Sequence, residues 1–129
     1  MFNTKDIANL KEVVHNQGSW HNHTHIAIEN SGKMTKDESA IKHFTKLLTD
    51  AISSHKPGQF FFAKKEESFS TFQLVENSCI AGDFSFENPK SSLEIFSSNQ
   101  LNLEEVLRIT REFFSGSALE VTTFQKVGN

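Results

Sequence analysis

The stretch that decides how this chain is interpreted reads Glu76-Asn77-Ser78-Cys79-Ile80-Ala81-Gly82-Asp83, and Phe84-Ser85-Phe86-Glu87 follows it directly. We predict that residues 78–82 form a short strand. Two other serines stand at fixed spacings from Ser78: Ser70 lies eight residues before it and Ser98 lies twenty residues after it. The segment from Ser70 to Ser98 therefore supplies the frame in which the rest of the chain is interpreted.

The segment that begins the sequence has the spacing of a short amphipathic helix. It runs from Thr4 to about Asn16, and Gly18 is suited to end it. The apolar residues along one side of this helix are Ile7, Leu10, Val13 and Val14.

Two further helices are predicted later in the chain. Thr35 and Glu38 fit a capping box at the start of the first one, and Pro57-Gly58 ends it. Its apolar stripe consists of Ile41, Phe44, Leu47, Leu48 and Ile52. The second helix is expected to begin after Asn102 as N-cap and to run to Phe114.

Strand patterns fill the remaining segments. They are residues 20–29, 60–63, 69–75, 93–96 and 119–124, in addition to 78–82. In the first strand, His21, His23, His25 and Ala27 alternate with Asn22, Thr24, Ile26 and Ile28, so the two sets face opposite sides.

The order of elements is α-β-α-β-β-β-β-α-β, in a single domain over residues 1–129 with 1–18 as an additional N-terminal helix. Because the strands cluster in the middle, hairpins and antiparallel pairing should dominate. We predict an α+β two-layer sandwich in which the two long helices cover one face of the sheet. The other face needs a partner, and the sheet of a second copy would serve, which predicts a homodimer.

Composition limits the classes of function. The 129 residues include thirteen basic and sixteen acidic side chains, a net charge of −3, which argues against an extended nucleic-acid-binding surface. No segment approaches the ~20 apolar residues that span a bilayer, and residues 1–6 lack the pattern of a signal peptide. The single cysteine excludes an internal disulfide and fits a reducing compartment, so a cytoplasmic location is expected.

From His25 onward the sequence resembles bacterial S-adenosylmethionine decarboxylases, which cut their own chain before a serine and convert that serine into a pyruvoyl group. The family reads Glu-Ser-His, then a second His five residues past the Ser, then a Phe-Thr-Cys strand end. Here the same frame reads Asn77-Ser78-Cys79, then Asp83, then Phe96-Ser97-Ser98. Residues 25–29 match the family's first strand, Ser70 an active-site serine, and Glu87 the Glu of Trp-Pro-Glu. The resemblance implies the family's fold.

The differences from the family fall on the groups that perform its chemistry. Ser78 remains as the nucleophile, but Asp83 stands where the family has its histidine base, and an ordinary carboxylate is a far weaker base. Ser98 replaces the proton-donating cysteine, with a hydroxyl that is far too weakly acidic to substitute for it. Cys79 and Asn77 replace the other two groups.

Two functions from different classes follow from this resemblance. One is a pseudoenzyme that needs no cofactor. It would bind S-adenosylmethionine or a related amine, or it would modulate a partner such as an active paralogue in polyamine (spermidine) synthesis. The other is an active pyruvoyl-dependent decarboxylase of S-adenosylmethionine or another amino acid. In that enzyme Ser78 is the pyruvoyl precursor, Asp83 and Ser70 are the processing groups, and Ser98 is a proton-relay position.

Three weaker alternatives remain beside these. Cys79 could be a reactive thiol, although lone cysteines are usually inert and buried. The run His21-x-His23-x-His25 could hold a zinc ion from one face of a strand, with no clear fourth ligand in the sequence. We expect most phenylalanines to lie in the core, but Phe84 and Phe86 remain candidates for rings that stack on a ligand. Glu87, beside them, is a third candidate ligand residue.

Overall fold

The structure, a computed structural model, describes residues 22–29, 37–52, 57–76, 78–86, 90–98, 101–115 and 117–125. The predicted N-terminal helix lies outside these residues, as do His21, Thr35, Asn77 and Glu87. In the described part of the chain, no helix is long and apolar enough to cross a membrane.

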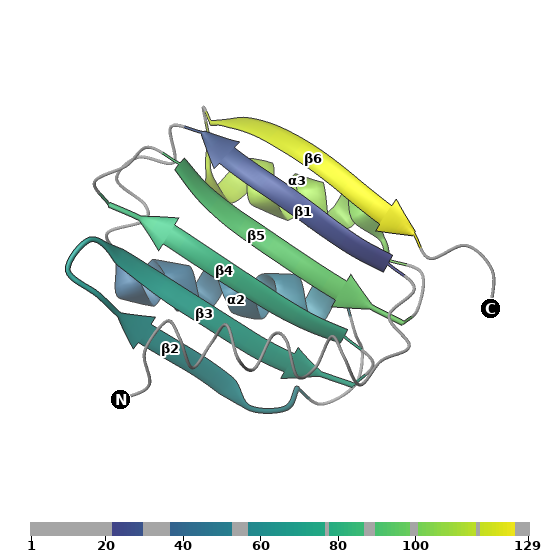
Figure 1. Cartoon of the computed structure of the whole chain (residues 1–129), viewed down its shortest axis with the longest axis horizontal. Coiled ribbons are helices and arrows are strands. Elements are labelled where there is room, and N and C mark those ends of the chain that lie inside the picture. The colour runs from purple at the N-terminus through teal and green to yellow at the C-terminus, as the bar shows by residue number, and fades with distance from the viewer. Residues whose placement is uncertain are drawn as a thin grey trace.

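The described strands form one sheet of six strands. They are β1 (Asn22–Glu29), β2 (Phe60–Lys64), β3 (Ser68–Val75), β4 (Ser78–Ser85), β5 (Lys90–Ser97) and β6 (Ala118–Gln125). Their order across the sheet is β2-β3-β4-β5-β1-β6, and every neighbouring pair is antiparallel. Helices α2 (Glu38–Ile52) and α3 (Leu103–Phe113) lie together behind the sheet in Figure 1. The predicted antiparallel α+β sandwich is therefore confirmed.

The face of the sheet under the helices, called the helix face below, carries the larger core. Phe44 of α2 and Val106 of α3 are fully buried there, together with Ile26 and Ile28 of β1. This is the side that the alternation in residues 22–29 predicts for the two isoleucines. Burying a side chain of this size stabilises the fold by about 1.5–3 kcal/mol.

The opposite side of the sheet, called the far face, carries a smaller apolar cluster. Its buried members are Ala63, Phe72, Cys79, Ala81 and Phe96, from strands β2 to β5. Strand alternation separates the two clusters, since neighbouring residues of a strand point to opposite faces.

The ends of the helices differ in part from the sequence-based expectation. The side chain of Asp37 accepts a hydrogen bond from the backbone N–H of Ala40, at 3.1 Å, and α2 begins at Glu38. The prediction of Thr35 as the N-cap is therefore wrong, because Asp37 supplies the oxygen that caps the first turn. Asn102 does cap α3 as predicted, through the N–H of Glu105 at 3.3 Å.

Gly82 marks a place where the sheet leaves no room for a side chain. A Cβ atom there would lie 2.5 Å from the ring of Phe84 and 2.8 Å from Oγ1 of Thr71. The Phe84 ring lies over the glycine, and Phe84 itself is fully buried against Phe44 and Phe114 of the helix layer. The glycine is needed here for close packing, and no unusual backbone conformation is involved.

Candidate functional site

Ser78 lies at the first position of β4, directly across from Ser97 of β5. Its Oγ donates a hydrogen bond to Ser97 Oγ at 3.2 Å, and both side chains are buried. Ser78 has the same strand parity as Ile80, so it points toward the helix face. The residue expected to be the nucleophile is thus part of a buried pair of hydroxyl groups.

Ser70 and Asp83 form a second pair, on the neighbouring strands β3 and β4. They are directly opposite in the register, and Ser70 Oγ donates to Asp83 Oδ1 at 3.1 Å. Ser70 is buried, whereas Asp83 is exposed to solvent. Both have the parity of Phe72 and Ala81, which places them on the far face.

The structure does not bring these two pairs together within one chain. Asp83 is five residues beyond Ser78 on the same strand, which is about 17 Å along it. Because five is an odd number, the two side chains also point to opposite faces. Within one chain, Asp83 is therefore not in reach of Ser78, although the sequence places both in the same candidate site.

Ser98 follows the last residue of β5 and is half-buried. The structure pairs Ser78 with Ser97 instead, one position earlier in the chain. The sequence frame missed Ser97 because spacing alone cannot distinguish two successive serines. Only the register of the ladder decides which of them lies opposite Ser78.

Cys79 has no exposed surface and lies across from Leu74 and Phe96 on the far face. Its surroundings are the apolar side chains of the far-face cluster. A reactive thiol usually lies in a partly exposed, electropositive environment. The buried, apolar surroundings of Cys79 are of the opposite kind.

The aromatic residues beside Asp83 divide between the core and its margin. Phe84 has no exposed surface, so its ring contacts core side chains and is not accessible to a ligand. Phe86 is half-buried and meets Phe69 edge to face, with ring centroids 4.7 Å apart. Glu87, the third ligand residue expected from the sequence, lies outside the described residues.

The histidines of β1 lie on the exposed part of the far face. His23 stacks on Phe96 with ring centroids 4.2 Å apart, and its Nε2 lies 3.4 Å from Oε1 of Glu94. His25 lies directly across from Glu94 in the register. No group of three histidine, cysteine or acidic residues suited to a metal ion occurs within the described residues, and His21 lies outside them.

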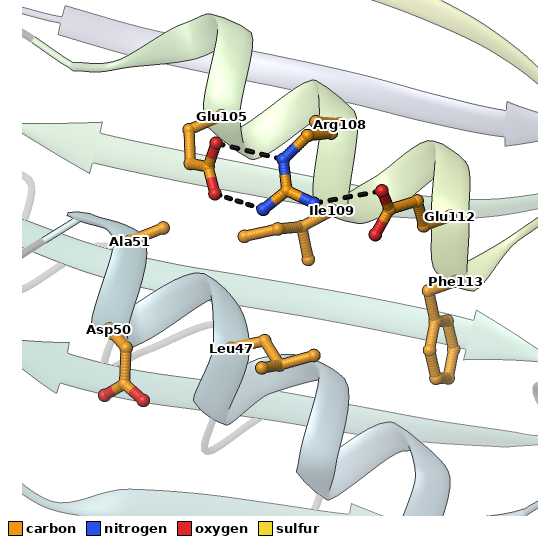
Figure 2. Close-up of a pocket in the computed structure, with 8 residues that line it drawn as sticks. All are labelled: Leu47, Asp50, Ala51, Glu105, Arg108, Ile109, Glu112 and Phe113. Atoms are coloured by element: carbon orange, nitrogen blue, oxygen red, sulfur yellow. Dashed lines mark hydrogen bonds and ion pairs between the residues drawn. The ribbon is translucent and has the colours of Figure 1, made fainter.

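A groove between the two helices is a feature that the sequence did not indicate. It has a volume of about 530 Å³, and Leu47 from α2 and Ile109 and Phe113 from α3 form its apolar part. Figure 2 shows Arg108 at its rim, held between Glu105 and Glu112, with Asp50 on the opposite helix. The hydrogen bond from Arg108 lowers the pKa of Glu105, and the two carboxylates raise the pKa of Arg108.

This groove is separate from the sites predicted on the sheet. None of the serines, histidines or phenylalanines singled out in the sequence lines it. The sequence signal on offer was the spacing of acidic and basic residues three and four apart on α3. Leu47 has the spacing of the core stripe, and only the structure shows that it is 39% exposed.

Comparison with known proteins adds a match in structure only. No protein-family model matches the chain. No curated protein matches its sequence either. Among solved structures, the fold is similar to that of the adenosylmethionine decarboxylase from Aquifex aeolicus VF5, with a TM-score of 0.63 and 5% sequence identity over 84% of this chain and 92% of that chain. The protein therefore has the fold of an adenosylmethionine decarboxylase.

Proposed function

We propose that this protein is a non-processing pseudoenzyme with the S-adenosylmethionine decarboxylase fold. Its role would be to bind S-adenosylmethionine or a related amine, or to modulate a partner such as an active paralogue in polyamine synthesis. The observation that carries the proposal is that Asp83, an exposed carboxylate that accepts a hydrogen bond from Ser70, stands at the position where the family has its histidine base.

Self-processing makes specific demands on these residues. The hydroxyl of Ser78 must attack the carbonyl carbon of Asn77 to form an ester, and a base must then remove the α-proton of Ser78 so that the ester is eliminated. Asp83 stands at the position of that base. Its carboxylate is exposed and already accepts a hydrogen bond from Ser70 on the far face, while Ser78 is paired with Ser97 on the helix face. A carboxylate is a far weaker base than the family's histidine, and this supports a chain that stays intact.

The intact mass of the purified protein tests the proposal directly. We expect a single species at the full-length mass of 14.6 kDa that persists on storage, identical in behaviour to the Ser78→Ala variant. Two fragments divided between Asn77 and Ser78, with the second blocked by a pyruvoyl group, would contradict the pseudoenzyme. If the wild type is cut in this way, Ser78→Ala should remain uncut, because it lacks the attacking hydroxyl group.

The binding part of the proposal has its own test. S-adenosylmethionine should raise the melting temperature of the full chain, because a ligand that binds only the folded state stabilises it by mass action. Methionine, which lacks the adenosyl group, is the matched control and should not do so. An equal response to the two compounds, or no response to either, would contradict binding of S-adenosylmethionine.

The second candidate function is an active pyruvoyl-dependent decarboxylase. Two observations favour it: Ser78 is retained, and the Asn77–Ser78 bond lies in the short connection between the end of β3 and the start of β4. In this case the candidates to relay a proton are Ser98, which follows the last residue of β5, and Ser97, which lies opposite Ser78 in the register. The same mass measurement distinguishes the two functions.

A further inference from the structure

The groove between α2 and α3 has an apolar floor that is accessible from outside. Leu47 of α2 is 39% exposed, and Ala51 lies one helical turn after it. Ile109 and Phe113 of α3 have the same spacing of four residues and line the groove from the other side (Figure 2). Because residues four apart lie on one side of a helix, each helix presents a short apolar ridge to the groove.

The floor is held in place by the core beneath it. The ring of Phe113 stacks on Phe44 with centroids 4.6 Å apart, and Phe44 is fully buried. Ile109 is 7% exposed, so it also belongs mainly to the core. Ala51 is the smallest of the lining side chains, and the space in front of its methyl group stays open. The groove is therefore a fixed feature of the helix pair.

Acidic side chains outnumber basic ones around this floor. Among the described residues that line the groove, Asp50, Glu105 and Glu112 carry carboxylates and Arg108 carries the one positive charge. Arg108 donates hydrogen bonds to both glutamates, each at 3.0 Å, so its charge is already compensated. Asp50 has no hydrogen bond or ion pair with another described residue. The rim is thus negative overall, and Asp50 is available to a cation.

These features select the class of partner. A second copy that docked groove against groove would bring two negative rims together, and like charges across an interface oppose binding. An amphipathic helix suits the groove better, because its apolar residues at positions three and four apart can pack between the two ridges. Lysine or arginine residues beside those positions would meet Asp50 and the carboxylates of α3.

We propose that the groove between α2 and α3 binds a basic amphipathic helix of another protein. The apolar residues of that helix pack between Leu47 and Ile109, and its cations approach Asp50 and Glu112. This inference does not depend on Ser78, because no residue of the candidate site on the sheet lines the groove. It applies to a processed and to an intact chain alike.

A synthetic peptide of leucine and lysine tests the proposal on the full chain. The peptide is about 14 residues long, with its leucines at helical spacing, and its fluorescence anisotropy should rise to saturation on titration with the protein. The same peptide with glutamate in place of lysine should bind at least ~10-fold more weakly. Equal binding of the two peptides, or no saturable binding of the lysine peptide up to about 1 mM protein, would overturn the proposal.

A variant of the floor shows whether the peptide occupies the groove. Leu47→Asp introduces a charge at an exposed position and should weaken binding of the lysine peptide at least ~10-fold, because it removes an apolar anchor. Ser39→Asp adds the same charge at another exposed position of α2 and should leave the affinity unchanged. Melting temperatures check that both variants are folded. Unchanged binding by folded Leu47→Asp would contradict the proposal.

Asp50→Lys decides the outcome if Leu47→Asp does not fold, since Asp50 is exposed. It should weaken binding of the lysine peptide by about 3–10-fold. Glu66→Lys makes the same change in net charge at an exposed position between β2 and β3, and it should have a smaller effect. Equal losses would indicate a general attraction to the acidic chain and would overturn the proposal. So would a dimer of the purified protein that Asp50→Lys dissociates, because a second copy would then occupy the groove.

Discussion

The hydroxyl groups of Ser78 and Ser97 lie 3.2 Å apart across strands β4 and β5, and both side chains are buried on the helix side of the sheet. A buried pair of this kind contributes to stability as long as both partners are present. We expect Ser78→Ala to lower the free energy of unfolding by about 1 kcal/mol.

The measurement for this pair is a double-mutant cycle in denaturant. Ser78→Ala and Ser97→Ala should show a coupling free energy of about 0.5–1.5 kcal/mol. The matched control cycle uses Ser91→Ala in place of Ser97→Ala. Ser91 is another buried serine of β5, and its Oγ accepts a hydrogen bond from the backbone N–H of Ser85 at 3.1 Å. Ser78→Ala and Ser91→Ala should be additive, and equal coupling in both cycles would contradict a direct Ser78–Ser97 interaction.

Gly82 and Phe84 give a prediction about packing. Gly82→Ala places a Cβ atom 2.5 Å from the Phe84 ring, so the ring or the strand must move. We expect a loss of about 1–3 kcal/mol in the free energy of unfolding. The loss should be smaller when Gly82→Ala is introduced into a Phe84→Leu background, because the smaller side chain can give way. An undiminished loss in that background would show that the ring is not the obstacle.

Thr71 and Thr110 form a matched pair of fully buried threonines with opposite expectations. The hydroxyl of Thr71 has no hydrogen-bond partner within the described residues, whereas Thr110 Oγ1 donates to the carbonyl oxygen of Val106 at 2.7 Å. Thr71→Val removes an unsatisfied polar group and should raise the free energy of unfolding by up to ~1 kcal/mol. Thr110→Val should not raise it. Chemical denaturation measures both, and destabilisation by Thr71→Val would indicate a bound water or other partner there.

The ion pairs of Arg108 predict a dependence on pH and salt. Arg108 lowers the pKa of Glu105, so their interaction stabilises the protein above the pKa of an unfolded glutamate and is lost as the pH falls through the lower, folded pKa. We therefore expect a slightly lower melting temperature for Arg108→Gln at neutral pH and low salt. The difference should vanish in strong acid, below about pH 3, and in 1 M salt.

Arg111→Gln is the control for that experiment. It removes the same charge from the same helix, at a position with no ion pair to a described residue. Its effect on the melting temperature should change less between neutral and acidic pH. If the two variants respond alike, helix charge in general and not the pair with Glu105 is responsible.

The local elements were largely predictable, because they depend on spacing along the chain. The alternation of Ile26 and Ile28 with His23 and His25 correctly assigned the two faces of β1, and Asn102 correctly marked the start of α3. Leu47 was a partial failure: it has the right spacing for the core stripe, yet it is 39% exposed on the groove between the helices. Helical spacing defines a broad apolar face, but the neighbouring helix decides how much of that face is covered.

The candidate site shows the same division more sharply. The sequence by itself determined which groups are available, namely Ser70, Ser78, Asp83 and Ser98 at fixed spacings along the chain. It also predicted the antiparallel sandwich that contains them. Only the tertiary structure decided that Ser78 meets Ser97, that Asp83 meets Ser70, and that the plane of the sheet lies between the two pairs. The physical reason is that strand register and the parity of each side chain are fixed by hydrogen bonds between strands, which spacing within one strand does not contain.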